Sequence, residues 1–309
     1  MNKLEQLKQH TIVVADTGDF EAVEQYRPQD STTNPSLIYT AAQMPAYKEF
    51  CQKIIKDASG QNIEDILDEL IVSFGCELTK RVKGYVSTEV DAALSFDTQA
   101  TVEKAQKLMK LYRQKGVDSS RILIKIASTW EGIQAARVLE EQGIKCNLTL
   151  LFSLVQAAAC AKAKAFLISP FVGRILDWYK KNGLYKERDV DPGVTSVQNI
   201  YRYYKQFSYD TVIMGASFRS LEEIEQLCGL DRLTIAPKFL EILQSDNKGL
   251  SNQMNQLSTD LFESELDVSE KSFRFLLNED AMATEKLSEG IRLFHQDTQK
   301  LRQLIASYL

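Results

Sequence analysis

The sequence is poor in the residues that build histidine metal sites and hydrolytic triads. Its 309 residues include only two histidines, His10 and His295, which lie near opposite ends of the chain. A histidine-based metal site or a Ser-His-Asp triad is therefore hard to assemble. The five cysteines are odd in number and contain no CxxC pair, and most lie within apolar patterns. This usage is typical of buried, reduced thiols in a cytoplasmic protein.

Signals for nucleic acid, membranes and nucleotides are also missing. Lys and Arg number 37 against 42 Asp and Glu, a net charge of −5, so no basic excess favours nucleic acid or an anionic membrane. No stretch approaches the roughly 18–20 apolar residues that span a bilayer. The first residues contain only a short apolar run ending in Asp16, unlike a secretory signal. No GxGxxG or GxxxxGK[ST] motif occurs in the positions that bind nucleotides.

Short β-branched apolar runs that end in polar residues recur along the chain. Most of the intervals between them have helical periodicity, clearest in 101–115, 131–142 and the Ala-rich 154–164. Strands that alternate with helices imply parallel strands joined by right-handed crossovers. Eight such units favour a closed (β/α)8 TIM barrel over an open doubly wound sheet. The expected strands are 11–16, 30–34, 84–91, 121–128, 144–151, 165–171, 210–217 and 231–237. The second, DSTTN, is the weakest, since it is similar to a loop.

No strand pattern returns after Pro237. Residues Leu287, Ile291, Phe294 and Leu301 follow one another at spacings of four, three and seven, and this period predicts one long amphipathic helix. We therefore expect one domain over 1–309, with 238–309 as a helical extension that packs on the barrel. The interval 35–83 is long enough for two helices, and 180–193 is a polar loop at the barrel rim.

Lys125 is the clearest ionisable residue inside an expected strand, with Ile124 and Ile126 on either side. One interpretation is a lysine that points outward along a helix or joins a structural ion pair. The other is a nucleophile: burial lowers the pKa of a lysine from about 10.4, and a neutral amine attacks carbonyl carbons.

Other polar residues share strand faces or strand ends with this lysine. Ser87, Glu89 and Asp91 lie on one face by the period of two, and three polar residues exceed what a single ion pair needs. Asn147 and Thr149 share another face, where they could simply satisfy each other. Asp16 closes the first strand, a position often held by a turn residue but also the end at which barrel active sites lie.

Two arginines, Arg174 and Arg219, follow late strands. Either could be an ordinary surface residue, but barrels commonly bind phosphate on this side, and arginine suits bidentate contact with phosphate oxygens. Together these patterns predict a buried amine with carboxylates and hydroxyls around it and cations at the rim. Such a set of groups is suited to amine-catalysed chemistry on a phosphorylated polyol.

These segments resemble the class I transaldolases of the longer type. DSTTNPSL at 30–37 is similar to the family's first signature, and ILIKIASTWEGIQAA at 122–136 to the second, which contains the Schiff-base lysine. The resemblance runs from about residue 4 to the C-terminus and is weakest in 240–275. Further matches, in order, are VVADTGD, VSTEVDAALS, CNLTLLFS, FLISPFVGRILDWY, DPGV, VIMGASFR and DRLTIAP.

The resemblance implies a homodimeric cytoplasmic enzyme of the non-oxidative pentose phosphate pathway that needs neither metal nor organic cofactor. It would transfer a dihydroxyacetone unit from fructose 6-phosphate or sedoheptulose 7-phosphate to erythrose 4-phosphate or glyceraldehyde 3-phosphate. Lys125 would form the imine, Asp16 would be the general acid/base, and Glu89 would move protons through a water held with Thr149. Substrate contacts would come from Asn34, Asn147 and Ser169, pocket walls from Thr32, Ser87 and Phe171, and phosphate contacts from Arg174, Ser217 and Arg219.

Two other functions stay open at this point. A Schiff-base aldolase would release dihydroxyacetone or cleave a related sugar phosphate, but Asp16 as the proton shuttle, with no tyrosine in its place or beside Phe171, favours the transferase. A non-catalytic sugar-phosphate-binding barrel would have no use for Lys125, Glu89 and Asp16. One departure from the family pattern is Ala93, where arginine is frequent, and we expect it to face away from the catalytic centre.

Overall fold

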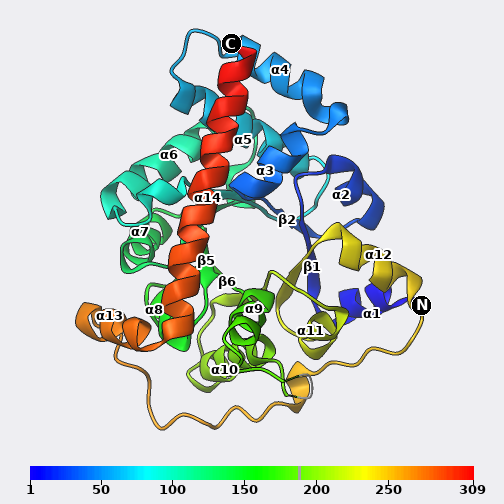
Figure 1. The fold of residues 1–309 in the computed structure, drawn as a ribbon, viewed down its shortest axis with the longest axis vertical. Coiled ribbons are helices and arrows are strands. Elements are labelled where there is room, and N and C mark those ends of the chain that lie inside the picture. The colour runs from blue at the N-terminus through cyan, green and yellow to red at the C-terminus, as the bar shows by residue number, and fades with distance from the viewer. Residues whose placement is uncertain (187–188) are drawn as a thin grey trace.

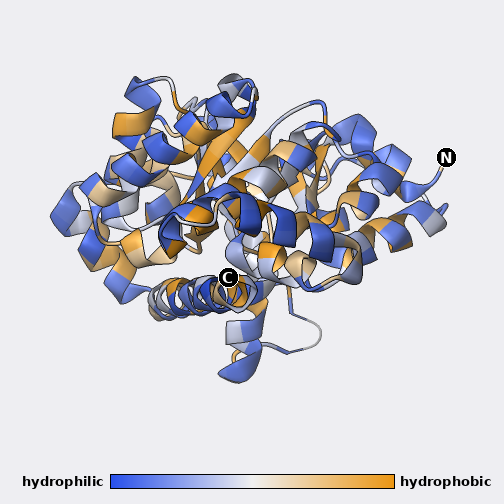
Figure 2. Ribbon diagram, turned by 90° about the horizontal axis from the view of Figure 1, so that it is seen from above, coloured by the Kyte–Doolittle hydropathy of each residue, from blue (hydrophilic) through white to orange (hydrophobic). Residues whose placement is uncertain are grey.

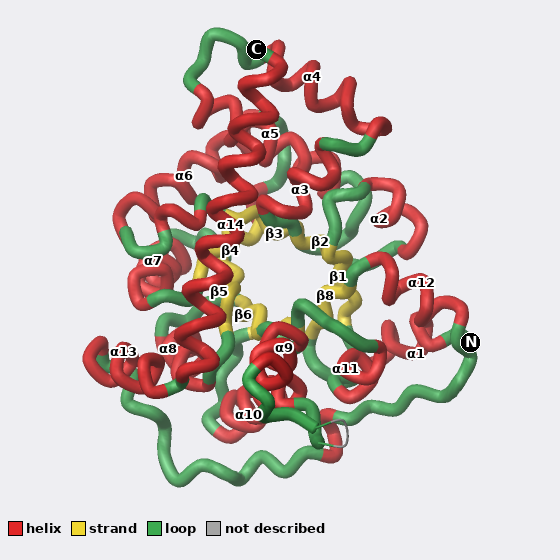
Figure 3. The backbone as a smooth tube through the Cα atoms, viewed as in Figure 1, coloured by secondary structure: helices red, strands yellow, loops and turns green. Residues whose placement is uncertain are grey.

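Parallel strands close into a barrel at the centre of the molecule (Figures 1 and 3). The structure, a computed structural model, describes residues 1–186 and 189–309. Each strand pairs with its sequence neighbours, and β1 pairs with β8 to complete the ring, so the predicted (β/α)8 barrel is confirmed. The strands are β1 Ile12–Asp16, β2 Asp30–Thr32, β3 Val86–Glu89, β4 Ile122–Ala127, β5 Cys146–Leu151, β6 Leu167–Pro170, β7 Val212–Gly215 and β8 Arg232–Ile235.

Each of the eight expected segments contains one of these strands. The shortest is β2, whose three residues explain why its sequence is similar to a loop. It is paired on both sides, because Thr32 of β2 lies opposite Asp16 of β1 and also opposite Ser87 of β3. This register brings the carboxyl ends of β1, β2 and β3 to the same edge of the barrel.

Helices surround the strands, as Figure 3 shows. The periodic segments 101–115, 131–142 and 154–164 correspond to α6, α7 and α8. The interval 35–83 holds three α-helices rather than the two expected, because Pro45 begins a separate short 3-10 turn after α3. Of the predicted polar loop 180–193, residues 187–188 lie outside the described part. The helices around the barrel are α1 Lys3–His10, α2 Phe20–Tyr26, α3 Pro35–Ala42, α4 Lys48–Asp57, α5 Ile63–Thr79, α6 Thr98–Gln114, α7 Trp130–Glu141, α8 Leu154–Lys162, α9 Gly173–Lys181, α10 Pro192–Gln206 and α11 Leu221–Gln226.

The C-terminal segment is helical, and its last helix lies across the barrel (Figures 1 and 2). It contains α12 Pro237–Ser245, α13 Glu270–Glu279 and α14 Ala281–Tyr308, and residues 246–269 between α12 and α13 are irregular except for the short 3-10 helix η4 Met254–Gln256. Helix α14 contacts α3, α5, α9 and β5, and its predicted apolar stripe is buried. Arg302 ties it to the barrel by ion pairs with Glu64, at 2.6 Å, and Asp91, at 2.5 Å. Among the described residues, no helix has both the length and the apolar character needed to cross a bilayer.

Apolar side chains fill the space between the strands and the outer helices, and Figure 2 shows this apolar character on the inner strands. The five cysteines, all free, belong to this buried set, which confirms their predicted burial. A smaller apolar layer, made of Val14, Leu123, Leu167 and Met214, fills the barrel interior. It separates the carboxyl-end side chains from those at the amino end.

A buried ion pair closes the amino end of the barrel. Arg232, the first residue of β8, lies 2.7 Å from Asp30, the first residue of β2, and both side chains are almost fully buried. The Arg232 guanidinium also stacks near the rings of Tyr85 and Phe166, at 5.1 and 5.8 Å. Burial raises the pKa of Asp30, and the nearby Arg232 opposes that rise. Arg232 therefore compensates a carboxylate that water does not reach.

We expect Arg232→Met to lower the free energy of unfolding by about 3–5 kcal/mol, because it leaves the Asp30 carboxylate buried and unpaired. Urea denaturation at neutral pH measures this change. The double variant Asp30→Asn/Arg232→Met removes both charges and should recover most of the loss. A single variant as stable as the parent would show that the pair does not hold this end of the barrel together.

Candidate functional site

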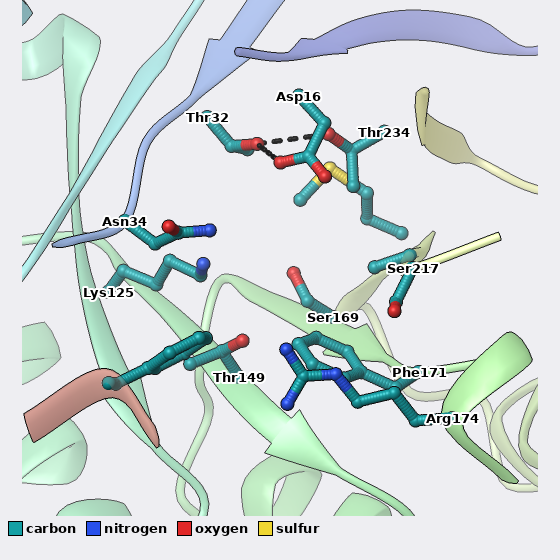
Figure 4. A pocket seen from close by; sticks show the side chains of 13 residues that line it. Asp16, Thr32, Asn34, Lys125, Thr149, Ser169, Phe171, Arg174, Ser217 and Thr234 are labelled. Atoms are coloured by element: carbon teal, nitrogen blue, oxygen red, sulfur yellow. Dashed lines mark hydrogen bonds between the residues drawn. The ribbon is translucent and has the colours of Figure 1, made fainter. Parts of the chain in front are cut away.

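A polar pocket opens at the carboxyl ends of the strands, opposite the Asp30–Arg232 pair (Figure 4). The space between its side chains measures about 390 Å3 including the mouth. Nine of the residues that the sequence singled out line it directly. They are Asp16, Thr32, Asn34, Lys125, Thr149, Ser169, Phe171, Arg174 and Ser217.

Lys125 lies inside the barrel because its neighbours on β4 face outward. Ile124 and Ile126 pack into the apolar layer beneath the helices, so the alternation of the strand turns Lys125 into the pocket. The side chain is 6% exposed, and its Nζ lies 3.0 Å from Glu89 Oε2 and 3.5 Å from the carbonyl oxygen of Thr33. The outward orientation is therefore wrong. The ion pair is present, and the catalytic interpretation stays a prediction.

Glu89 comes to Lys125 because the two are directly opposite in the β3–β4 register. Its contact with Lys125 is an ion pair without an aligned hydrogen bond at Oε2. Thr149 Oγ1 is likewise buried with no hydrogen-bond partner among the described residues. Burial raises the pKa of Glu89, while the charge of Lys125 opposes the rise. A carboxyl group with a raised pKa beside an amine is suited to accept and return a proton.

Asp16 lies at the end of β1 and accepts a 3.1 Å hydrogen bond from Thr32 Oγ1. Thr32 in turn lies 2.9 Å from the Thr234 hydroxyl, as the dashed lines in Figure 4 show. Burial raises the pKa of Asp16, opposed by Lys125, by the Thr32 hydrogen bond and by Arg174. Two carboxyl groups of raised pKa thus surround one amine: Asp16 lines the pocket, and Glu89 lies behind its wall against Lys125.

A chain of hydrogen bonds below the pocket orients its hydroxyl groups. Ser169 Oγ donates to Asn147 Oδ1 at 2.6 Å, and Asn147 Nδ2 donates to Ser87 Oγ at 3.1 Å. Ser87 and Asn147 are buried behind Ser169 instead of forming the pocket wall. Asn34 reaches the pocket but also caps α3, since its Oδ1 accepts from Leu37 N at 2.9 Å.

The two predicted phosphate ligands differ in their surroundings. Arg174 lines the pocket, stacked near the rings of Phe171 at 4.9 Å and Phe294 at 5.5 Å. It makes no ion pair with any carboxylate of the described residues. Burial and the nearby Arg219 lower the pKa of Arg174, a sign that the two cations repel each other. Arg219 is exposed and pairs with Asp177 at 2.8 Å, outside the pocket wall.

Three residues of the pocket wall were not predicted from the sequence. They are Met214, Thr234 and Phe294. Thr234 carried a usable signal, because it is a hydroxyl within an apolar strand. Phe294 carried none, since it belongs to the apolar stripe of an amphipathic helix.

Two expectations near the end of β3 are corrected or refined by the structure. Asp91 does not share the inner face with Glu89, because β3 ends at Glu89 and Asp91 turns outward to Arg302. Ala93 lies in the short 3-10 helix η2 Ala92–Leu94, where it is exposed and away from the pocket, as expected.

The raised pKa of Asp16 has a direct consequence for stability. An acid whose folded-state pKa exceeds its unfolded value stabilises the fold while protonated, and this contribution is lost as pH rises from about 4 through the raised pKa. At neutral pH the Asp16 carboxylate therefore costs stability. We expect Asp16→Asn, which can still accept from Thr32, to be more stable than the parent at pH of about 7.

Thermal or urea unfolding at several pH values measures this difference. It should shrink as pH falls toward about 4, where the parent carboxyl becomes protonated as well. An Asp16→Asn variant less stable than the parent at neutral pH would show that the ion pairing of Asp16 outweighs its burial.

The sequence was compared with models of known protein families. Residues 13–305 match the family described as transaldolase/fructose-6-phosphate aldolase. The matched span begins at the second residue of β1 and includes β2 to β8 and Phe294 of α14.

Proposed function

Because this chain belongs to the transaldolase/fructose-6-phosphate aldolase family of sugar-phosphate enzymes, we propose that it is a transaldolase. It transfers a dihydroxyacetone unit from fructose 6-phosphate or sedoheptulose 7-phosphate to erythrose 4-phosphate or glyceraldehyde 3-phosphate. The observation that carries the proposal is the buried Lys125 amine, 3.0 Å from Glu89, in a pocket that also holds Asp16 and Arg174.

In the first step Lys125 forms an imine with the C2 carbonyl of the donor. The ammonium group first gives a proton to Glu89, whose burial raises its pKa and favours the neutral acid. The neutral amine then adds to C2, and the carbinolamine oxygen leaves as water after Glu89 returns the proton. Thr149 Oγ1 and Glu89 Oε2, both without hydrogen-bond partners, are suited to hold the water that relays this proton.

In the second step Asp16 removes the proton of the C4 hydroxyl. The C3–C4 bond breaks, its electron pair moves toward the iminium nitrogen, and an aldose phosphate leaves. The enamine stays bound to Lys125 until an acceptor aldehyde arrives. Its C3 then attacks the aldehyde carbon, and Asp16 returns the proton to the new alkoxide. Water finally adds to C2 of the product imine, the C2–N bond breaks, and the new ketose phosphate leaves the Lys125 amine. The Thr32 hydrogen bond orients the Asp16 carboxyl for both transfers.

The phosphate group binds at the cationic side of the pocket. Arg174 is held by two aromatic rings and has no carboxylate partner in the described chain, so its charge is available for an anion. Ser217 lies beside it, and Arg219 sits at the rim with Asp177. Ser169, Asn34 and the Asn147–Ser87 pair behind them serve the hydroxyl groups of the sugar.

A Schiff-base aldolase that releases dihydroxyacetone is the second candidate, since the family includes fructose-6-phosphate aldolase. Asp16 as the proton carrier favours the transferase, and so does the Phe171 ring, which offers no hydroxyl at this wall. We also propose a single domain, a homodimer in the cytoplasm, a place in the non-oxidative pentose phosphate pathway, and chemistry without metal or organic cofactor.

Borohydride reduction in the presence of fructose 6-phosphate tests the nucleophile. We expect a reduced three-carbon adduct on the peptide that contains Lys125, formed only when the ketose is present. Peptide mass mapping detects it, and Lys125→Met should form no adduct while losing turnover. Addition of erythrose 4-phosphate before the borohydride should diminish the adduct and yield sedoheptulose 7-phosphate.

Two results would contradict the proposal. Near-normal turnover by folded Lys125→Met would remove the catalytic assignment. An adduct that is lost as free dihydroxyacetone, with no transfer to erythrose 4-phosphate, would favour the aldolase.

Arg174 should contribute more to phosphate binding than Arg219. We expect Arg174→Gln to raise KM for fructose 6-phosphate about tenfold or more, the size of a lost charge-assisted hydrogen bond. Arg219→Gln is the matched control and should have a smaller effect, because Asp177 already pairs with that guanidinium. Steady-state kinetics decide, and equal KM values for both variants would show that the pocket cation does not bind the phosphate.

A further inference from the structure

Phe294 lines the pocket, and the proposed mechanism uses it only as one of the two rings beside Arg174. It comes from α14, far along the chain from the strands that carry the chemistry. Its side chain is buried, at 2% exposure, and packs with an apolar group that includes Phe171, Leu287 and Ile291. An apolar ring among so many polar side chains covers part of the pocket that water would otherwise reach.

The ring also lies within reach of both cations of the site. Its centroid is 5.8 Å from Lys125 Nζ and 5.5 Å from the guanidinium carbon of Arg174. Aromatic faces attract cations at such distances, so the ring helps to fix the Arg174 side chain. Phe294 thus contacts the nucleophile on one side and the phosphate ligand on the other.

Hydrogen bonds on both sides of Phe294 hold its helix in place. Toward the start of α14, Glu285 accepts from Trp178 Nε1 of α9 at 2.7 Å. Toward its end, Arg302 binds Glu64 and Asp91. Between these anchors Asp297 accepts from Ser36 of α3. The segment of α14 that carries the ring is therefore held by hydrogen bonds to α9, to α3, and to Glu64 and Asp91.

We propose that Phe294 is a specificity-determining residue that favours transfer of the three-carbon unit over its release. The inference rests on the proposed Schiff-base function. Release begins when the enamine takes a proton at C3 and becomes an iminium. Water then adds to C2, the C2–N bond breaks, and dihydroxyacetone leaves the free Lys125 amine. Transfer bonds C3 of the enamine directly to the acceptor aldehyde. Both routes end when water hydrolyses an imine on Lys125, so they differ only in the proton that release needs at C3. An apolar cover beside the enamine keeps water, the source of that proton, away from C3, and it therefore slows release and leaves transfer open.

The test compares Phe294→Leu with Phe273→Leu. Leucine keeps an apolar side chain at residue 294 but removes the ring face, and Phe294→Met is a second variant of closer volume. Phe273 is a matched control, because it is 1% exposed and packs on Trp130, away from the pocket. Free dihydroxyacetone and sedoheptulose 7-phosphate are measured together, with fructose 6-phosphate as donor and erythrose 4-phosphate as acceptor.

We expect the ratio of release to transfer to rise several-fold in both Phe294 variants and to stay at the parent value in Phe273→Leu. KM for fructose 6-phosphate should rise about two- to fivefold, since Arg174 loses one aromatic contact. A release ratio equal to that of Phe273→Leu, in a folded Phe294 variant that still forms the adduct, would overturn the proposal. Failure of the parent enzyme to form any adduct would instead refute the proposed function and this inference with it.

Discussion

The Lys125–Glu89 ion pair is the interaction on which the rest of the site depends. Two charges that are almost fully buried cost desolvation energy, and their attraction repays this only in good geometry. That geometry comes from the β3–β4 register, which sets the two residues opposite each other, and from Ile124 and Ile126, which anchor β4 to the outer apolar layer. Strand pairing and apolar packing therefore hold the two charged side chains together in a position that neither would keep by itself.

The barrel interior is divided into layers, and this division keeps the reactive charges apart from the structural ones. At the amino end, the positive charge of Arg232 compensates the buried carboxylate of Asp30, and this ion pair fills the end of the barrel. Val14 and Met214 belong to the apolar layer that follows, and the pocket begins beyond it. Lys125 lines the pocket, whereas neither Asp30 nor Arg232 does, so we infer different roles for these two ion pairs although their chemistry is similar.

Much of this arrangement was accessible from the sequence, because it depends on local alternation. Eight apolar runs that alternate with helical segments predicted the barrel, and polar residues inside those runs, such as Lys125 and Glu89, predicted the end at which the pocket lies. The same rule failed at Asp91, since alternation holds only while the strand lasts and β3 ends at Glu89. The number of helices between residues 35 and 83 was also underestimated, because helical patterns on the two sides of a proline can be taken for one longer helix.

Phe294 could not be predicted as a pocket residue, and the reason lies in how amphipathic helices bury one face. An amphipathic helix repeats apolar residues on one face, and nothing local distinguishes a residue that meets other apolar groups from one that meets a catalytic amine. Leu301 and Phe294 have equivalent places in the pattern, yet Leu301 joins the main core and Phe294 reaches the pocket. In the function that we propose, the strands of the barrel carry the groups that make and break bonds, while a helix outside the barrel contributes an apolar part of the pocket wall. The pattern along the strands predicts that chemistry, but the proposed preference for transfer over release depends on contacts that only the folded chain creates.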